Sequence, residues 1–207
     1  MFSTVKATDP DSTEVLSDEA LTALYEAWAD SLNATFVYDT GTVTLKDDLA
    51  KLTVPEGFRY LNPESADIVL TDMWGNPPSE PGYGSLGMLF PNDITPMDEN
   101  TYAINITWSE EGYIDDTDAK DIDYDELLET IQEDARLASE TRVELGYEPV
   151  EIVGWASAPF YDEANKKLHW AQEIKFGESP DHTLNYNIRV LGRRGYLNLN
   201  VIGGMDV

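Results

Sequence analysis

The chain has 207 residues, which suits one domain, or one domain with an appended helix. Its 40 acidic and 13 basic side chains leave a net charge of -27, which argues against nucleic acid and anionic membrane surfaces as partners. The chain has no cysteine and only two histidines, so disulfides, thiolate catalysis and a three-histidine metal centre are excluded.

The first half of the sequence is predicted to alternate short helices with short strands. Residues 1–16 are polar and are expected to form a flexible N-terminal segment. Ser17 can cap the first helix, whose apolar residues recur on one face. In chain order the expected elements are a helix over 17–31, a hairpin of 36–38 with 43–45, a strand over 49–54, a helix over 63–73, and strands over 85–90 and 102–108.

The second half is predicted to contain one long helix followed by strands. An apolar stripe at helical spacing runs from Tyr124 to Leu145, and Gly146 is placed to end that helix. The expected strands are 150–155, 167–176, 184–191 and 196–202. Strands joined by hairpins, with helices in separate blocks, indicate an α+β fold. We expect an antiparallel β-sheet with helices packed against it, in a single domain over residues 17–207.

Several sequence blocks occur in a fixed order and identify a family. They are Val54-Pro55-Glu56-Gly57-Phe58, Trp74-Gly75-Asn76, Gly112-Tyr113-Ile114-Asp115-Asp116, Gly154-Trp155-Ala156, Lys167-Leu168-His169-Trp170-Ala171 and the run from Leu184 to Arg193. With these blocks, residues 41–205 resemble the bacterial domain of unknown function 2167, a family described as predicted membrane-anchored proteins. The resemblance implies a periplasmic domain of the cell envelope, attached to the membrane through a C-terminal anchor outside this chain. It implies no catalytic residue.

An acidic stretch before the long helix is a candidate metal site. Asp115, Asp116 and Asp118 could supply oxygen ligands to a hard cation such as calcium, the one cofactor that the sequence suggests. The alternative is that these acids favour the start of the helix by capping free N–H groups and opposing its dipole.

A polar strand face is a candidate ligand site. Alternation places Asn185, Asn187 and Arg189 on one side of their strand. If the neighbouring strand adjoins in register, His169 and Glu173 would converge with them and could bind a polar ligand such as a glycan or a peptide. The catalytic alternative is a hydrolase or transferase that uses Glu173, His169 and Arg189, although four residues of strand separate the first two by about 13 Å. A solvated sheet face with cross-strand hydrogen bonds is the structural alternative.

Two aromatic loops add further candidates for ligand binding. Trp74 and Asn76 lie in one loop, and Trp155 and Tyr161 lie in or near the other. Such loops can form a cleft or a partner surface, or their tryptophans can anchor the core. Taken together, the sequence predicts a non-catalytic envelope domain that binds a protein partner or an envelope ligand. A cation-binding structural module remains a third alternative beside the enzyme.

Overall fold

The computed structural model describes residues 17–98, 100–117, 119 and 122–206. The chain divides into two compact units, residues 1–35 and 36–207. In the described part of the first unit, helix α1 (Asp18–Asn33) begins after Ser17, whose Oγ accepts a hydrogen bond from the Ala20 amide at 3.3 Å. This confirms the predicted helix over 17–31. The predicted flexible segment, 1–16, lies outside the described residues.

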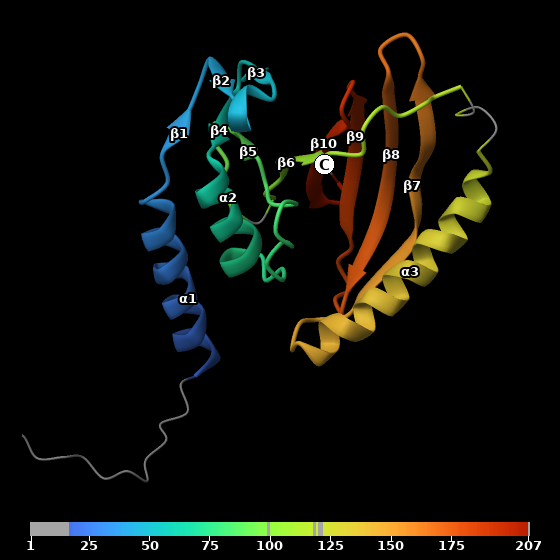
Figure 1. Ribbon diagram of the computed structural model, residues 1–207. Helices are drawn as coiled ribbons and strands as arrows, with labels where there is room; N and C mark the ends of the chain where they lie inside the picture. Colours follow the sequence, from blue (N-terminus) through green and yellow to red (C-terminus); the bar gives the residue numbers. More distant parts are fainter. Residues whose placement is uncertain (1–16, 99, 118, 120–121, 207) are drawn as a thin grey trace, which may run out of the picture. The chain divides into compact units, whose positions relative to one another are not determined.

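The second unit is built on an antiparallel sheet of eight strands (Figure 1). In spatial order they are β1 (Tyr38–Asp39), β4 (Phe58–Leu61), β5 (Met88–Pro91), β6 (Ala103–Ser109), β10 (Tyr196–Gly204), β9 (Thr183–Leu191), β8 (Lys167–Phe176) and β7 (Val150–Asp162). Strands β2 (Thr42–Thr44) and β3 (Lys51–Thr53) pair separately. The predicted α+β fold with an antiparallel sheet is confirmed.

Helices α2 (Pro63–Ile68) and α3 (Tyr124–Glu144) of the second unit each begin after a residue whose side chain caps the first turn. Helix α2 follows Asn62, whose Oδ1 accepts from the Ser65 amide at 2.9 Å, and it continues into the π-helical turn η2 (Val69–Met73). A short 3-10 turn, η1 (Lys46–Asp48), precedes β3. Helix α3 is capped by Asp123, which accepts from two backbone amides of the first turn. No helix in the described part of the chain is long and apolar enough to cross a membrane.

Strand register sorts the side chains onto two faces, because directly paired residues project from the same side of a sheet. Asn187 is paired with Trp170 on β8 and with Asn200 on β10. Asn200 is in turn paired with Asn105 on β6. We call this side, which carries asparagines on three neighbouring strands, the amide face.

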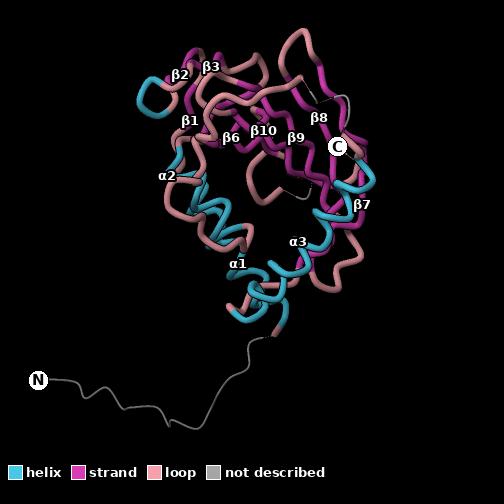
Figure 2. Tube along the Cα trace, turned by 45° about the vertical axis from the view of Figure 1, so that its right-hand side comes forward, coloured by secondary structure: helices cyan, strands magenta, loops and turns pink. Residues whose placement is uncertain are grey.

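Helix α2 with the turn η2 covers one end of the amide face, and helix α3 covers the other end. The middle of the face lies between them. At one end Trp74, which follows η2, packs edge-on against Phe90 of β5, with ring centroids 6.4 Å apart. At the other end α3 is held to β7 through polar contacts, including Gln132 Nε2 to the Ile152 carbonyl at 3.1 Å and the Val150 amide to Ser139 Oγ at 2.8 Å. Figure 2 shows α2 and α3 on the same side of the sheet, with β9 and β10 between them.

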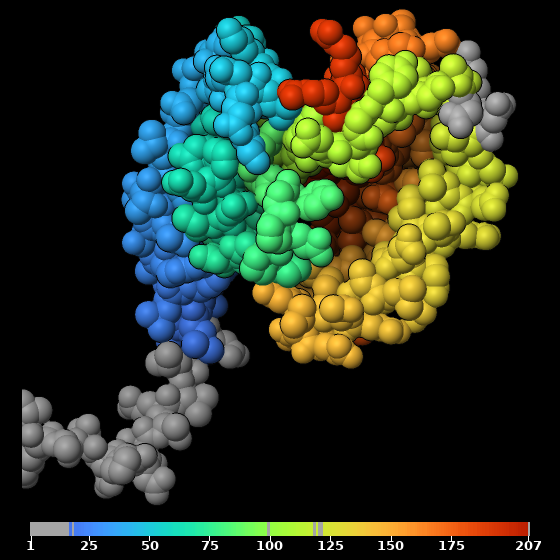
Figure 3. Space-filling model, viewed as in Figure 1, coloured from blue at the N-terminus to red at the C-terminus, as the bar shows by residue number. Residues whose placement is uncertain are grey.

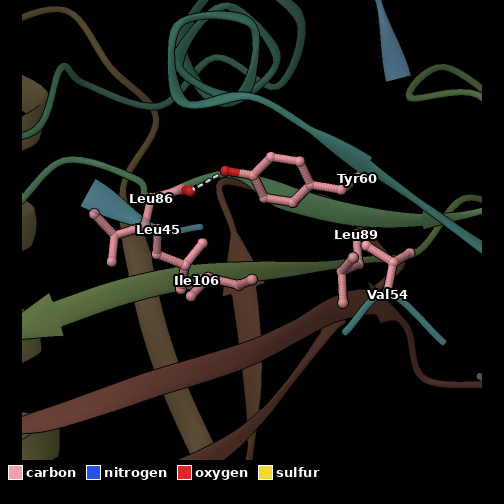
Figure 4. Packing of buried hydrophobic residues seen from close by; sticks show 6 residues of the cluster. All are labelled: Leu45, Val54, Tyr60, Leu86, Leu89 and Ile106. Carbon is pink, nitrogen blue, oxygen red and sulfur yellow. Dashed lines mark hydrogen bonds between the residues drawn. The ribbon is translucent and has the colours of Figure 1, made fainter. Parts of the chain in front are cut away.

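The opposite side of the sheet, the apolar face, holds a cluster of buried hydrophobic residues (Figure 4). The buried cluster consists of Leu45, Val54, Tyr60, Leu86, Leu89 and Ile106. Leucines and valines of the β2–β3 sheet and of β10 pack against it, so the small sheet covers β4, β5, β6 and β10 on this side. The Tyr60 hydroxyl donates to the Leu86 carbonyl at 2.6 Å, which satisfies the polar atom of this buried ring.

The predicted strands differ from the observed ones in three respects. The hairpin of 36–38 with 43–45 does not form, since β1 pairs with β4, and β2 pairs with β3. Strand β4 was not predicted, because Pro55-Glu56-Gly57 marked the end of a strand. Gly57 instead adopts a φ of +87°, and the turn that it makes returns the chain to the sheet. Strand β7 also runs past its predicted end at 155, because register shifts between Ile152 and Gly154, between Trp155 and Ser157, and between Ser157 and Phe160 let it stay paired with β8 up to Asp162.

Candidate functional site

The middle of the amide face is hollowed into a groove between α2–η2 and α3. Figure 3 shows the hollow with the orange and red strands at its floor and the yellow helix α3 along one side. A central cavity of about 480 Å³ lies on the α3 side, and a side cavity of about 450 Å³ lies toward Trp74. Asn185 lines both cavities, so they adjoin.

The central cavity draws its lining from α3 and from four strands or strand ends. The lining residues are Ile122, Tyr124, Leu127, Ile131, Trp155, Pro159, Leu168, Trp170, Gln172, Asn185, Asn187, Arg189 and Asn200. The α3 and β7 residues are mainly apolar, whereas those of β9 and β10 are amides and one guanidinium. The cavity therefore has apolar walls and a polar floor, which is typical of small-ligand sites.

Asn187 is the centre of the polar floor. Its side chain is 7% exposed, its Nδ2 donates to the Asn185 carbonyl at 3.3 Å, and its Oδ1 accepts from Asn198 Nδ2 at 3.2 Å. These bonds fix the side-chain amide in one orientation. The floor is therefore preorganised by the protein.

The amides around Asn187 have hydrogen-bonding capacity that the protein does not use. Within the described residues, six buried side-chain N or O atoms have no hydrogen-bond partner, and four of them belong to β9 and β10. These four are Oδ1 of Asn185, Asn198 and Asn200, and Nε of Arg189. A buried polar atom without a partner costs about 1–3 kcal/mol, so these four atoms on two adjacent strands need hydrogen-bond partners from outside the protein, which water or a polar ligand can supply.

Arg189 is held by aromatic rings and not by a carboxylate. Its guanidinium carbon lies 4.8 Å from the Trp170 ring centroid and 4.6 Å from that of Tyr196. No ion pair with an Asp or Glu of the described residues accompanies these contacts. Cation–π contacts of this kind orient the guanidinium and leave its N–H groups available.

The walls of the central cavity are tryptophan and aliphatic side chains. Trp155 donates its indole Nε1–H to the Tyr124 carbonyl at 3.2 Å, which ties β7 to the start of α3 and sets the ring against the cavity. Trp170 lies on the floor beside Asn187. Neither Trp170 nor Gln172 was among the predicted ligand-binding residues. Alternation along β8 places both on the same side as Leu168, but only the register against β9 puts that side on the amide face.

The predicted aromatic loop at Trp74 reaches the side cavity. Trp74 Nε1 donates to the Pro96 carbonyl at 2.9 Å, and Asn76 Nδ2 donates to the Leu70 carbonyl at 3.0 Å. Both residues line the side cavity together with Asn185. Among the predicted ligand-binding residues, the structure thus brings together Trp74, Asn76, Trp155, Asn185, Asn187 and Arg189 along one groove.

The expected convergence of His169 and Glu173 with Arg189 is wrong. His169 is paired with Ile188 and Glu173 with Leu184, so both project from the apolar face while Arg189 projects from the amide face. His169 Nδ1 lies 3.1 Å from the Tyr186 hydroxyl, and Glu173 Oε1 lies 2.6 Å from Nδ1 of His182. The register of β8 against β9 separates the two groups by the thickness of the sheet.

Of the candidate metal ligands, Asp116 is engaged by other side chains. Its Oδ2 accepts hydrogen bonds from the Tyr161 hydroxyl and from Lys166 Nζ, the latter at 2.6 Å. Asp115 Oδ1 accepts from the Thr117 amide at 3.0 Å, and Asp118 lies outside the described residues. Tyr161 therefore anchors the segment after β6 to the β7–β8 hairpin and does not line either cavity. The described residues contain no group of three or more metal-ligating side chains.

The contacts between Asp116, Tyr161 and Lys166 predict how this attachment responds to pH. The hydrogen bond from Lys166 and that from Tyr161 lower the pKa of Asp116 below its usual 3.8, and partial removal from water together with the Asp116 carboxylate raises the pKa of Tyr161 to about 12. Since the folded protein favours protonated Tyr161, the stability that this group contributes is fully present below pH 10 and is lost as the pH rises toward 12. The Asp116 contribution is present above pH 3.8 and is lost as the pH falls below it.

The alkaline half of this prediction is checked by titrating phenolate absorbance in the native protein and in Tyr161→Phe. The difference between the two curves should have a midpoint near pH 12. A midpoint near 10, the usual value for tyrosine, would contradict the contact with Asp116.

Comparison with known proteins supports the predicted family. The model of a family described as "Protein of unknown function (DUF2167)" matches residues 37–207, close to the predicted span of 41–205. The match begins near the boundary of the second unit, so the matched region is the sheet, its helices and the groove. No curated protein and no solved structure matches the chain.

Proposed function

We propose that the chain, which belongs to the DUF2167 family of proteins of unknown function, is a non-catalytic module that binds a saccharide in the groove over its amide face. The observation that carries the proposal is the row of unpartnered asparagine oxygens on β9 and β10, beside the tryptophans of β7 and β8. The floor offers hydrogen bonds and the walls offer apolar contact within the same cavity.

A saccharide fits this combination of groups. Each sugar hydroxyl both donates and accepts hydrogen bonds, so it can satisfy the unpartnered oxygen of Asn185 or Asn200 and also the amide N–H groups beside it. The C–H face of a sugar ring is apolar and can pack on Trp155 or Trp170. The two adjoining cavities, of about 480 and 450 Å³, are each within the size range of small-ligand sites.

Several features favour binding over catalysis. Acid–base catalysis on a saccharide uses a pair of carboxyl groups or another proton-transferring group at the reacting bond. Among the described lining residues, the central cavity has no Asp, Glu or His, and the side cavity has a single carboxylate, Glu148, and no His. Glu173 and His169, the residues of the catalytic alternative, project from the other side of the sheet.

We further propose that the domain works on the extracytoplasmic side of the bacterial envelope, where its ligand would be an envelope glycan. This part rests on the resemblance of the sequence to a family of predicted membrane-anchored proteins. A protein partner on the same groove is the competing outcome of the experiment that follows.

The proposal is tested by isothermal titration of the purified chain with peptidoglycan fragments and other bacterial envelope oligosaccharides. We expect at least one saccharide to bind, and we expect Trp170→Ala and Asn200→Ala each to weaken that binding about tenfold, which corresponds to about 1.4 kcal/mol. Phe160→Ala is the matched control, because this aromatic ring is 63% exposed and lies on the apolar face, opposite His169.

Two results would overturn the proposal. One is the absence of binding by every saccharide while a protein ligand from the envelope binds the groove. The other is a saccharide whose affinity falls with Phe160→Ala and not with Trp170→Ala.

A further inference from the structure

The charge of the central cavity differs from that of the chain around it. The chain carries 40 acidic against 13 basic residues. Among the described residues that line the cavity, one is basic, Arg189, and none is acidic. The chain as a whole repels anions, but this cavity has no lining carboxylate that would repel an anion at short range, and it has one cationic side chain.

Arg189 itself is positioned to meet a charged ligand. Its guanidinium lies between the Trp170 and Tyr196 rings, and its Nε is buried without a partner. A partly buried charge without a counter-ion is unfavourable, and cation–π contacts compensate only part of that cost. A ligand carboxylate would supply the missing counter-ion, since the planar guanidinium fork matches a carboxylate with two parallel hydrogen bonds.

We infer that Arg189 recognises a carboxylate on the ligand, so that the groove takes an acidic saccharide. This inference rests on the proposed function and specifies its ligand. Asn185, Asn187 and Arg189 alternate along β9, and residues two apart in a strand are about 6.6 Å apart, so the row extends about 13 Å. The carboxylate then lies at the Arg189 end, and neutral hydroxyls extend along the asparagines toward Asn185.

The experiment compares matched ligands on the full chain. Oligosaccharides of uronic or muramic acids are titrated beside the same oligosaccharides with their carboxyl groups reduced to alcohols. We expect the native protein to bind the acidic form at least tenfold more tightly. Arg189→Gln should remove this preference, because it should weaken binding of the acidic form by at least tenfold more than binding of the reduced form. Arg189→Lys should retain only part of the preference because a lysine lacks the planar fork.

Arg193→Gln is the matched control. This arginine is exposed in the turn between β9 and β10, does not line the groove, and its replacement changes the net charge by the same amount. We expect it to keep the preference. Melting curves of all variants check their folding, and the comparison of the two ligand forms on the native protein does not depend on any variant.

The results of this experiment distinguish a failure of this inference from a failure of the proposed function. Equal binding of the acidic and reduced forms by the native protein overturns the role of Arg189 and leaves saccharide binding in place. A preference for the acidic form that persists in Arg189→Gln has the same two consequences. Binding of neither form, together with binding of a polyglutamate peptide, overturns the saccharide assignment and this inference with it.

Discussion

Replacing Phe90 by alanine should lower the free energy of unfolding by about 3–5 kcal/mol. Phe90 is 0% exposed, and its ring packs edge-on against Tyr38 and Trp74 with centroids 6.3 and 6.4 Å away. The substitution removes the apolar burial of the ring and leaves a cavity that the surrounding sheet and helix can fill only in part. Urea denaturation followed by circular dichroism measures the loss.

Phe90→Ala also affects the groove, because Trp74 lines the side cavity and packs on this ring. Phe160→Ala removes the same side chain from a position that is 63% exposed, and we expect it to change the stability by less than about 0.5 kcal/mol. A loss below about 1 kcal/mol for Phe90→Ala would mean that the ring is not the buried contact between β5 and Trp74.

Gly195→Ala should destabilise the protein by about 4 kcal/mol or more, the range of the most severe single substitutions. Gly195 has a φ of +145°, a conformation that residues with a side chain rarely adopt, and an added Cβ would lie 1.9 Å from the Ser109 carbonyl oxygen. That oxygen belongs to the backbone of β6 and cannot rotate away. The β9–β10 turn, closed by the Gly192 amide donating to the Gly195 carbonyl at 2.7 Å, would have to move.

Thermal and urea unfolding of Gly195→Ala measure this effect, with Gly154→Ala as the matched control. Gly154 lies in a strand, and an added Cβ there meets no atom within 4 Å. We expect the control to be close to neutral. If Gly195→Ala were as stable as Gly154→Ala, the close approach of the turn to β6 would be wrong, and with it the position of β10 beside β6.

The elements predicted well from sequence are those specified by neighbouring residues. Helices α1 and α3 start at Ser17 and Asp123, where a side chain caps the first turn, and α3 is followed by Gly146 with a φ of +88°. Strands β6, β8, β9 and β10 have clear alternation and were found close to their observed bounds. Such signals act over a few residues, so sequence alone contains them.

Strand partners could not be predicted in the same way. Strand β1 pairs with β4 across more than 20 residues, and β6 pairs with β10 across more than 80. Which strands pair with one another depends on the packing of the whole sheet, and local sequence patterns do not encode that packing. The short β4 was missed for this reason: its four residues form a strand because β1 and β5 lie on either side of it.

In the candidate site, too, the features within one strand could be predicted and those that depend on strand pairing could not. Asn185, Asn187 and Arg189 share a face within one strand, which alternation predicts directly. Whether His169 joins them depends on the register between β8 and β9, and a shift of one residue moves every side chain to the other face. The observed register places Trp170 and Gln172 beside the asparagines, so the neighbours on β8 were assigned with the wrong parity.

The measurement that tests the saccharide groove most directly is a heteronuclear NMR titration that follows the indole N–H signals of the five tryptophans. Each signal is assigned by a single Trp→Phe variant. Trp155 and Trp170 line the central cavity and Trp74 lines the side cavity, whereas Trp108 packs against the core on the apolar face. We predict that a bound saccharide shifts the Trp155 and Trp170 signals most and leaves that of Trp108 unchanged. Shifts at Trp108 with none at Trp155 and Trp170 would place the ligand on the opposite side of the sheet and contradict the groove as the binding site.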